Sequence, residues 1–263
     1  MVSSLYAAER GAGQKTVVFL HGFGGCHGVW GAVTEALVPD LRTLAYDLPG
    51  HGLSFPGSSA KAAARSILDD FAARGMRRAH VVGHSMGGAV ATLMALAEPD
   101  RVASLTLLAP GGFGPEINGP LLRRYAAATG KDEIHACLAA MSGPQSLPPN
   151  HIVEVLDEMR GRPGQLQKLV EIAAVITRDD RQGVIPREQL ATLTMPVMVV
   201  WGSDDAVLPF SQADDLPTHF HLHHVLGAGH MLAEEAPDLI AEIVRRNIRR
   251  RSRRPRSNLA AAS

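Results

Sequence analysis

Short apolar runs alternate along this chain with segments whose apolar residues recur at helical spacing. The run TVVFL at residues 16–20 is continuous and rich in β-branched residues, which is typical of a strand buried on both faces of a parallel sheet. Residues 59–74 instead carry Ile67, Leu68 and Phe71 at the spacing of one helix face. Further strands are expected over 5–9, 42–47, 102–108, 196–201 and 220–226, and in the run that leads from residue 80 into Ser85. This alternation predicts an α/β fold with a doubly wound, mostly parallel sheet.

The alternation stops after Pro110 and resumes near residue 194. Four helices are expected in between, over 120–129, 132–141, 150–160 and 165–177, separated by Gly-Pro, Pro-Pro and Gly-Arg-Pro-Gly breakers. A helical insertion of this size suits a cap over the carboxyl edge of the sheet, where open α/β sheets bind ligands. We therefore expect an α/β core formed by 1–110 and 194–250, a helical cap at 111–193, and a basic, disordered tail at 251–263.

Composition sets only broad limits. The 263 residues are 46% hydrophobic and 20% charged, as in an ordinary globular protein. No apolar run approaches the ~20 residues that span a bilayer, and no secretory signal is visible at the start. The only cysteines, Cys26 and Cys137, give no disulfide framework, so we expect a cytoplasmic protein.

The net charge of zero hides an asymmetry between the end of the chain and the rest. Eight of the 26 basic residues are arginines from Arg245 onward, where there is no acid, so the preceding part has 18 basic against 26 acidic residues. A tail of this kind can contact an anionic partner such as nucleic acid. Because it has no aromatic residues and no recognisable binding fold, we favour a solvated extension. The partner we expect is a small-molecule substrate, and the oligomeric state is left open.

The stretch VVGHSMGGA joins an expected strand to an expected helix at 89–97 through Gly-x-Ser-x-Gly. This arrangement is typical of a nucleophile elbow, a turn so tight that Ser85 must adopt strained backbone angles. Gly83 and Gly87 leave room where a Cβ would collide with the neighbouring strand or helix. The same pentapeptide also occurs in ordinary strand-to-helix turns, so the rest of the chain must decide its role.

A serine hydroxyl attacks well only when a base removes its proton and a carboxylate orients that base. On an elbow of this type the partners follow in the order serine, acid, histidine, each after a strand. The last two expected strands lead into turns that contain Asp204 and Asp205 in one case and His230 in the other. Both turns belong at the sheet edge that carries Ser85, which predicts a catalytic triad.

These motifs resemble those of the α/β-hydrolase family over nearly the whole chain. In the family's W-G-x-x-D-x-x-x-P motif the acid is the last aspartate, which implies Asp205 rather than Asp204 as the acid of the triad. The HGFGG segment matches the family's oxyanion loop, so the resemblance implies that the amides of Phe23 and Met86 bind the oxygen of a tetrahedral intermediate. The sequence does not separate Phe23 from Gly24 as the donor from this loop.

The segments FLHGFGG, LPGHGLS, VGHSMGG, SLTLLAPGGFGPEINGP and GAGHM carry a narrower likeness. They resemble the hydrolase region attached to the dihydrolipoamide acetyltransferase component of acetoin dehydrogenase. The chain shows neither a lipoyl domain nor a D-H-x-x-x-D-G acyltransferase signature. Its own residues therefore give no support to an acetyltransferase activity.

Other polar residues give weaker signals. We expect Gly24, Asn118 and Arg160 to contribute to the substrate pocket. Asn118 and Arg160 lie in the expected cap, where polar side chains select substrates. His84 is expected to pack beside the elbow rather than act as a base, and Cys26 lacks both an elbow and a base. The four histidines between 219 and 224 have no cysteine or carboxylate to complete a ligand set, so we expect no metal and no cofactor.

The sequence thus predicts a serine hydrolase that cleaves a small, partly apolar ester-like or ketone substrate. His230 takes the proton of Ser85, Asp205 orients His230, and water then releases the product. Two alternatives use the same triad, namely hydrolysis of a carbon–carbon bond in a ring-cleavage diketone and acyl transfer to an alcohol or thiol. A non-catalytic small-molecule binding protein on the same fold is the alternative from another class, and an intact triad argues against it.

Overall fold

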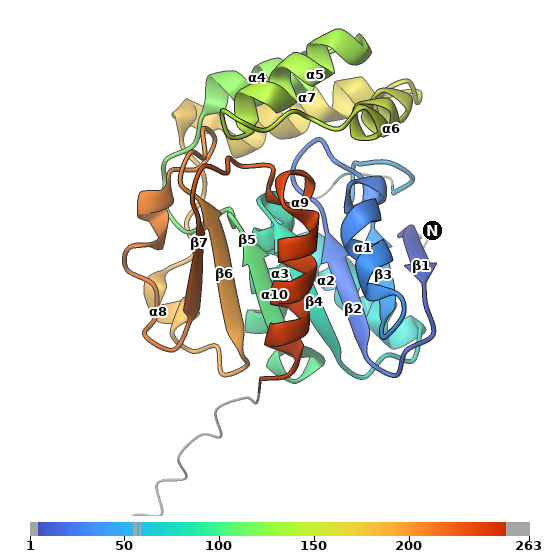
Figure 1. The fold of residues 1–263 in the computed structure, drawn as a ribbon, viewed down its shortest axis with the longest axis vertical. Coiled ribbons are helices and arrows are strands. Elements are labelled where there is room, and N and C mark those ends of the chain that lie inside the picture. The colour runs from blue at the N-terminus through green and yellow to red at the C-terminus, as the bar shows by residue number, and fades with distance from the viewer. Residues whose placement is uncertain (1–4, 55–56, 58, 251–263) are drawn as a thin grey trace, which may run out of the picture.

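The computed structural model describes residues 5–54, 57 and 59–250, and the strands of this part form one seven-stranded sheet (Figure 1). The strands are β1 (Ala7–Arg10), β2 (Thr16–Leu20), β3 (Arg42–Tyr46), β4 (Ala79–His84), β5 (Val102–Leu108), β6 (Val197–Gly202) and β7 (His221–Val225). Their order across the sheet is β1-β3-β2-β4-β5-β6-β7, and only β1 runs antiparallel to its neighbour. The predicted α/β fold with a mostly parallel sheet is confirmed.

Helices cover both faces of the sheet, and a further group lies beyond one end of it (Figure 1). α1 (Gly31–Leu37) packs against α10 (Pro237–Ile248) on one face, and α2 (Ala60–Ala73) packs against α3 (Met86–Ala97) on the other. The group at the top of Figure 1 comprises α4 (Gly119–Ala127), α5 (Gly130–Met141), α6 (Asn150–Arg160) and α7 (Gln165–Ile176). Two helices have four residues each, α8 (Arg187–Leu190) and α9 (Leu232–Glu235). Across the described residues, no helix combines the length and apolar character that crossing a membrane requires.

The parallel register brings the carboxyl ends of the central strands to one edge of the sheet. Leu20 of β2 pairs with Gly83 of β4, and Gly202 of β6 pairs with Val225 of β7. β5 joins the two pairs because it is parallel to both β4 and β6. The loops that follow β2, β4, β6 and β7 therefore emerge at the same edge, which is the edge that faces α4 to α7 in Figure 1.

Most expected elements lie within a few residues of their predicted positions, and the differences at the start of α3, in the first strand and in two short helices are the most informative. α3 begins at Met86 rather than 89, since the strand passes into the helix at Ser85 itself. The short strand expected over 5–9 runs over Ala7–Arg10. α8 and α9 are too short to show a helical period in sequence. The division into core and cap stays a prediction, and the tail at 251–263 lies outside the described residues.

α3 approaches the sheet so closely that only glycine can occupy two positions near its start. A Cβ built on Gly87 would lie 2.2 Å from the carbonyl oxygen of Leu20, and a Cβ built on Gly83 would lie 2.4 Å from the carbonyl oxygen of Gly87. Both obstacles are backbone atoms, which cannot rotate away as the end of a long side chain can. The steric role predicted for these two glycines is confirmed.

We expect Gly87→Ala to lower the free energy of unfolding by about 2 kcal/mol, because the new methyl group forces α3 away from β2. Gly31→Ala is the matched control. An added Cβ at Gly31 meets no atom within 4 Å, and the residue begins a helix, so alanine should raise the free energy of unfolding by up to about 1 kcal/mol. Urea unfolding followed by circular dichroism measures both changes. A Gly87→Ala variant as stable as the parent protein would contradict the steric argument.

Candidate active site

Ser85 lies between β4 and α3 with backbone angles that L-residues rarely adopt, φ 52° and ψ −118°. Four backbone hydrogen bonds hold it there. Its amide donates to the carbonyl of Leu108 over 2.9 Å, and its carbonyl accepts from the amides of Gly88 over 2.9 Å, Ala89 over 3.2 Å and Gly111 over 2.8 Å. A strained residue persists only where its surroundings over-determine its conformation, and these bonds do so. The strain predicted for the elbow is confirmed.

His230 and Asp205 come from the loops after β7 and β6 and meet in a buried pair. The distance between His230 Nδ1 and Asp205 Oδ2 is 2.8 Å, and the two side chains are 4% and 0% exposed. Asp205 Oδ1 accepts from the amides of Val207 and Leu208, each over 2.8 Å. These bonds fix the carboxylate, which in turn fixes the imidazole ring. The neighbouring Asp204 is exposed, so the structure brings Asp205 and not Asp204 to the histidine.

The loop that carries His230 is tied to the group of helices beyond the sheet edge. The amide of His230 donates to the carbonyl of Met141 at the end of α5 over 2.7 Å. The Glu235 carboxylate of α9 accepts from three backbone amides, those of Gly143, Gly229 and Met231. The ring of His84 donates from Nε2 to the carbonyl of His230 over 2.8 Å, so His84 supports the loop. Sequence reasoning missed Glu235, because an acid in a short helix has no motif of its own.

The loop after β2 holds the candidate oxyanion donors. The amide of Gly24 already donates to Nε2 of His51 over 3.2 Å. Within the described part of the chain, no hydrogen bond involves the amide of Phe23 or of Met86. Phe23 also lines the same cavities as Ser85. The contacts therefore favour Phe23 over Gly24, a choice that the sequence left open.

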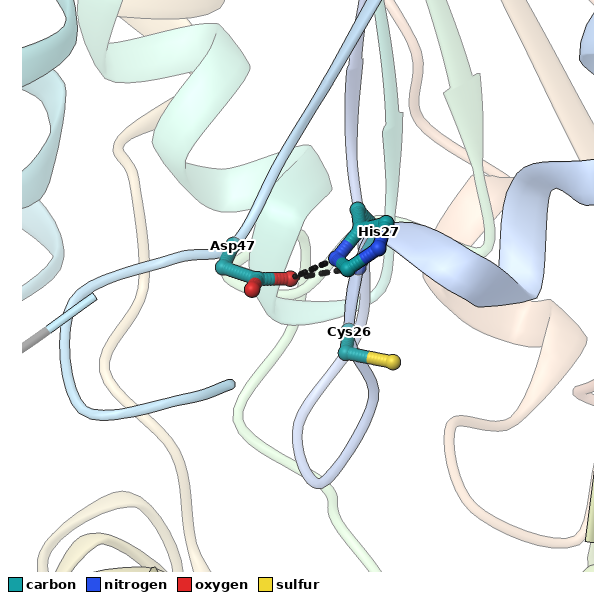
Figure 2. A group of neighbouring side chains, drawn as sticks. All are labelled: Cys26, His27 and Asp47. Carbon is teal, nitrogen blue, oxygen red and sulfur yellow. Dashed lines mark hydrogen bonds and ion pairs between the residues drawn. The ribbon is translucent and has the colours of Figure 1, made fainter. Parts of the chain in front are cut away.

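A buried carboxylate holds this loop against the turn at residues 47–54 (Figure 2). Asp47 Oδ1 accepts from the amide of His27 over 2.6 Å and lies 2.8 Å from His27 Nδ1. Asp47 Oδ2 accepts from the amide of Leu53 over 2.8 Å. Burial by itself would raise the pKa of Asp47, but the hydrogen bonds from the side chain and amide of His27 and from the amide of Leu53 hold that pKa below its ordinary value. The carboxylate therefore stays ionised while it holds two loops together.

Asp47 and His27 also form, with Cys26, a group whose potential metal-ligand atoms all lie within 4.8 Å of one another. Both oxygens of Asp47 already accept hydrogen bonds. Burial raises the pKa of the Cys26 thiol to about 12, and Figure 2 shows the sulfur directed away from Asp47. We therefore interpret these three residues as contacts that hold the loop in place rather than as a metal site.

Two cavities meet at Ser85, and they differ in size and lining. The larger, of about 390 Å³, is bounded mainly by apolar residues of α3, α7 and the segment 182–185. Besides Ser85, Gln182 is the single polar side chain among its lining residues. The smaller, of about 20 Å³, is lined by Ser85, His230 and Glu234 together with apolar side chains of α4, α5 and α6. An apolar chamber beside a few convergent polar groups is typical of a small-molecule site.

The three residues suggested for the substrate pocket make contacts within the fold and do not line the cavities. Asn118 caps α4 with its side chain and donates from Nδ2 to the carbonyl of Ala206 over 2.9 Å. Arg160 is buried, with its guanidinium 4.4 Å from the centre of the Tyr125 ring. The carbonyl of Gly24 accepts from the hydroxyl of Tyr125 over 3.2 Å. None of the three is among the residues that line the two cavities, so a direct substrate role for them stays a prediction.

Buried histidines surround the site in their neutral form. Burial lowers the pKa of His51 and of His84 to about 3, and it also lowers that of His21. The hydrogen bonds of His21 need a neutral ring, because Nε2 accepts from the amide of Leu48 over 2.9 Å while Nδ1 donates to the carbonyl of Gly22 over 2.7 Å. These rings therefore support loops rather than carry charge.

Comparison with known proteins adds the following relatives. The family model described as the Alpha/beta hydrolase family matches residues 17–243. The chain is 32% identical over 229 residues to the dihydrolipoyllysine-residue acetyltransferase component of the acetoin cleaving system of Cupriavidus necator. That match covers 85% of this chain and 61% of the relative, so the chain spans about three fifths of that protein's length.

Two further similarities cover most of both proteins compared. The chain is 30% identical over 226 residues to a 2-hydroxy-6-oxononadienedioate/2-hydroxy-6-oxononatrienedioate hydrolase of a Pseudomonas species, a match that covers 78% of this chain and 77% of the relative. A solved meta-cleavage product hydrolase from Pseudomonas fluorescens IP01 superimposes with a TM-score of 0.82 at 20% identity, over 92% of this chain and 93% of that one. The second likeness shows that the two proteins share a fold.

We predict that acid destabilises the protein, because the buried histidines resist protonation in the folded state. A histidine in the unfolded chain titrates near pKa 6.5, whereas His51 and His84 bind a proton only near pH 3 when folded. Below pH 6.5 the unfolded state therefore binds more protons, so this contribution to stability is complete above pH 6.5 and is lost as the pH falls toward 3. We expect the free energy of unfolding to drop by about 1.4 kcal/mol per pH unit for each of the two between pH 6 and 4. Urea unfolding across this range measures the slope, and a His84→Gln variant with an unchanged slope would contradict the assignment.

Proposed function

The chain belongs to the alpha/beta hydrolase family, as its motifs predicted, and from that premise we propose that it is a serine hydrolase acting through Ser85, His230 and Asp205. The observation that carries the proposal is the hydrogen bond between His230 Nδ1 and Asp205 Oδ2, beside a cavity that His230 and Ser85 line together. Such an arrangement supplies a nucleophile, a base and a group that orients the base.

The acylation step follows from these positions. Asp205 Oδ2 accepts a hydrogen bond from the protonated Nδ1 of His230, which leaves Nε2 as the nitrogen that takes the proton of Ser85. The Ser85 oxygen then attacks the carbonyl carbon of the substrate, and the carbonyl oxygen becomes an oxyanion. The amides of Phe23 and Met86 are the donors that we assign to it, since they are not engaged elsewhere in the described residues. His230 returns its proton to the leaving group as the acyl-enzyme forms.

The cavities indicate the kind of substrate. A chamber of about 390 Å³ has room for an acyl chain of several carbons, and its lining has no charged side chain. A charged group buried there would lose its hydration without a partner. We therefore propose an ester-like substrate with an uncharged, apolar acyl portion, and release of the acid product by water activated by His230.

The alternatives share this triad. The name of the Pseudomonas relative supports carbon–carbon bond hydrolysis, and the name of the Cupriavidus relative supports acyl transfer. The substrates in the first name are dicarboxylates, for which the larger cavity offers no cationic partner. This observation favours ester hydrolysis over carbon–carbon bond hydrolysis. Acyl transfer differs from ester hydrolysis only in that an alcohol or thiol, rather than water, takes the acyl group from Ser85.

Two further proposals concern the surroundings of the protein. We propose a cytoplasmic location, because both cysteines, Cys26 and Cys137, are free and buried. We propose a small molecule as the partner of the site, on the grounds of cavity size and lining. The basic tail lies outside the described residues and contributes nothing to either argument.

A fluorophosphonate probe tests the class of the protein. The probe reacts covalently with an activated serine, so we expect it to label the parent protein and to leave Ser85→Ala unlabelled. Mass spectrometry of the labelled peptide identifies the modified residue. A binding protein without catalysis would not label, and equal labelling of Ser85→Ala would place the reactive group elsewhere.

The two adjacent aspartates provide a matched test of the acid. Asp205→Asn keeps the shape of the side chain but removes the charge that orients His230, and we expect kcat to fall by about four orders of magnitude. Asp204→Asn makes the same chemical change at an exposed neighbour and should leave kcat within about twofold of the parent value. Hydrolysis of p-nitrophenyl butyrate measures both. If Asp204→Asn gave the larger loss, the assignment of the acid would be wrong.

A further inference from the structure

The two cavities at Ser85 differ in the other site residues that line them. His230 lines the smaller cavity together with Ser85, whereas it is not among the described residues that line the larger one. Met86, whose amide we assign to the oxyanion, lines the larger cavity and not the smaller. A carbonyl carbon attacked by Ser85 therefore has the base on the side of the smaller cavity.

The position of the base assigns the two portions of an ester to the two cavities. When the bond between the carbonyl carbon and the ester oxygen breaks, His230 gives its proton to that oxygen. The alcohol portion must therefore lie on the side that His230 lines. The acyl portion extends away from His230, into the larger cavity.

The sizes of the cavities limit the two portions of the ester unequally. The smaller cavity, of about 20 Å³, holds roughly one or two non-hydrogen atoms, since about 10–15 Å³ of such a volume holds one water molecule. The larger cavity, of about 390 Å³, has room for an alkyl chain. An ester of a short alcohol with a longer acid fits this arrangement, and the reversed ester fits it poorly.

The one polar side chain besides Ser85 that lines the larger cavity is already engaged within the protein. Gln182 Oε1 accepts from the amide of Gly112 over 2.9 Å. Gln182 Nε2 donates to the carbonyl of Glu116 over 3.2 Å and to Oε1 of Gln212 over 3.3 Å. A hydroxyl or carboxylate on the acyl chain would lose its hydration and find no free side-chain partner among the described residues there. The larger cavity therefore suits an unsubstituted alkyl chain.

One stripe of α3 forms the wall along which this chain would lie. Met86, Ala89 and Leu93 line the larger cavity, and their spacing of three and four residues places them on one face of the helix. The amide of Ala89 donates to the carbonyl of Ser85 over 3.2 Å, so Ala89 lies one turn from the nucleophile. Leu93 lies about 6 Å further along the helix axis, at 1.5 Å per residue. The smallest side chain of the stripe is thus the one nearest to the turn of the helix that follows Ser85.

We propose that the enzyme hydrolyses esters of short alcohols with unsubstituted straight-chain acids longer than acetic acid, and that Ala89 determines this specificity by admitting the acyl chain. This inference rests on the proposed serine hydrolase function and names its substrate class. A larger side chain at position 89 would lean toward the start of α3, because helical side chains point toward the N-terminus of their helix. It would occupy the space that acyl carbons beyond the acetyl group need.

Two isomeric esters test which cavity receives which portion of the substrate. Ethyl hexanoate and hexyl acetate have the same composition, but the longer chain is on the acyl side in the first and on the alcohol side in the second. Alkyl esters are required, because p-nitrophenolate departs as an anion without a proton from His230. We expect the parent protein to hydrolyse ethyl hexanoate with a kcat/KM at least about tenfold higher, since burial of each methylene favours binding about threefold to fourfold. Gas chromatography of the released alcohols measures both rates.

A substitution in α3 tests the role of Ala89. Ala89→Leu should lower kcat/KM for ethyl hexanoate about tenfold and leave that for ethyl acetate within about twofold of the parent value, because only the longer acyl chain needs the space. Ala97→Leu makes the same change at an exposed position of the same helix and should alter neither value. Hydrolysis of ethyl acetate shows that each variant is folded and has an active Ser85. Ala89→Val replaces Ala89→Leu if the latter does not fold.

The outcomes separate this inference from the function on which it rests. Equal or faster hydrolysis of hexyl acetate by the parent protein would overturn the assignment of the cavities, and so would a protein that reacts with the fluorophosphonate but hydrolyses none of these esters. An Ala89→Leu variant that keeps the parent's preference for ethyl hexanoate over ethyl acetate would overturn the role of Ala89. A parent protein that neither reacts with the fluorophosphonate nor hydrolyses ethyl acetate would instead overturn the proposed function.

Discussion

Ser85 keeps its φ of 52° because the hydrogen bond that it donates to Leu108 and those that it accepts from Gly88 and Gly111 leave the turn no relaxed alternative. Those partners belong to β5, to α3 and to the chain after β5, so the strained turn depends on the centre of the sheet. The close contact of Gly87 with β2 then fixes the direction of α3. The loops that bear Asp205 and His230 emerge at the same edge of the sheet as this turn, because β6 and β7 are parallel.

Much of this arrangement can be predicted from the sequence because it depends on local patterns. Buried parallel strands are continuous apolar runs, and TVVFL at 16–20 is one whatever its neighbours are. Gly83 and Gly87 mark a backbone approach that no other residue tolerates. The order of Ser85, Asp205 and His230 follows from the order of the strands, and the structure brings Asp205 and His230 into contact as expected. The class of reaction can therefore be predicted largely from short segments of the sequence.

The remaining features depend on contacts between distant segments. Asn118 and Arg160 are polar residues in the expected cap, yet they cap a helix and stack on Tyr125, which no local pattern indicates. Glu234 and Glu235 are adjacent and chemically identical, but one is saturated by amides and the other is not. The difference arises from the direction in which each side chain leaves a four-residue helix. Likewise, the engagement of the Gly24 amide with His51 spans 27 positions of sequence.

The bonds that join the His230 loop to α5 also determine where molecules can pass in and out. If α5 swung outward, the bonds to Met141 and Gly143 would break, and His230, the proposed base, would lose its position beside Ser85. On the side of α7 the larger cavity is bordered by Val175 and Val184, which are 65% and 51% exposed. We propose that a substrate enters the larger cavity on this side, at α7, where its passage would leave the bonds between α5 and the His230 loop intact.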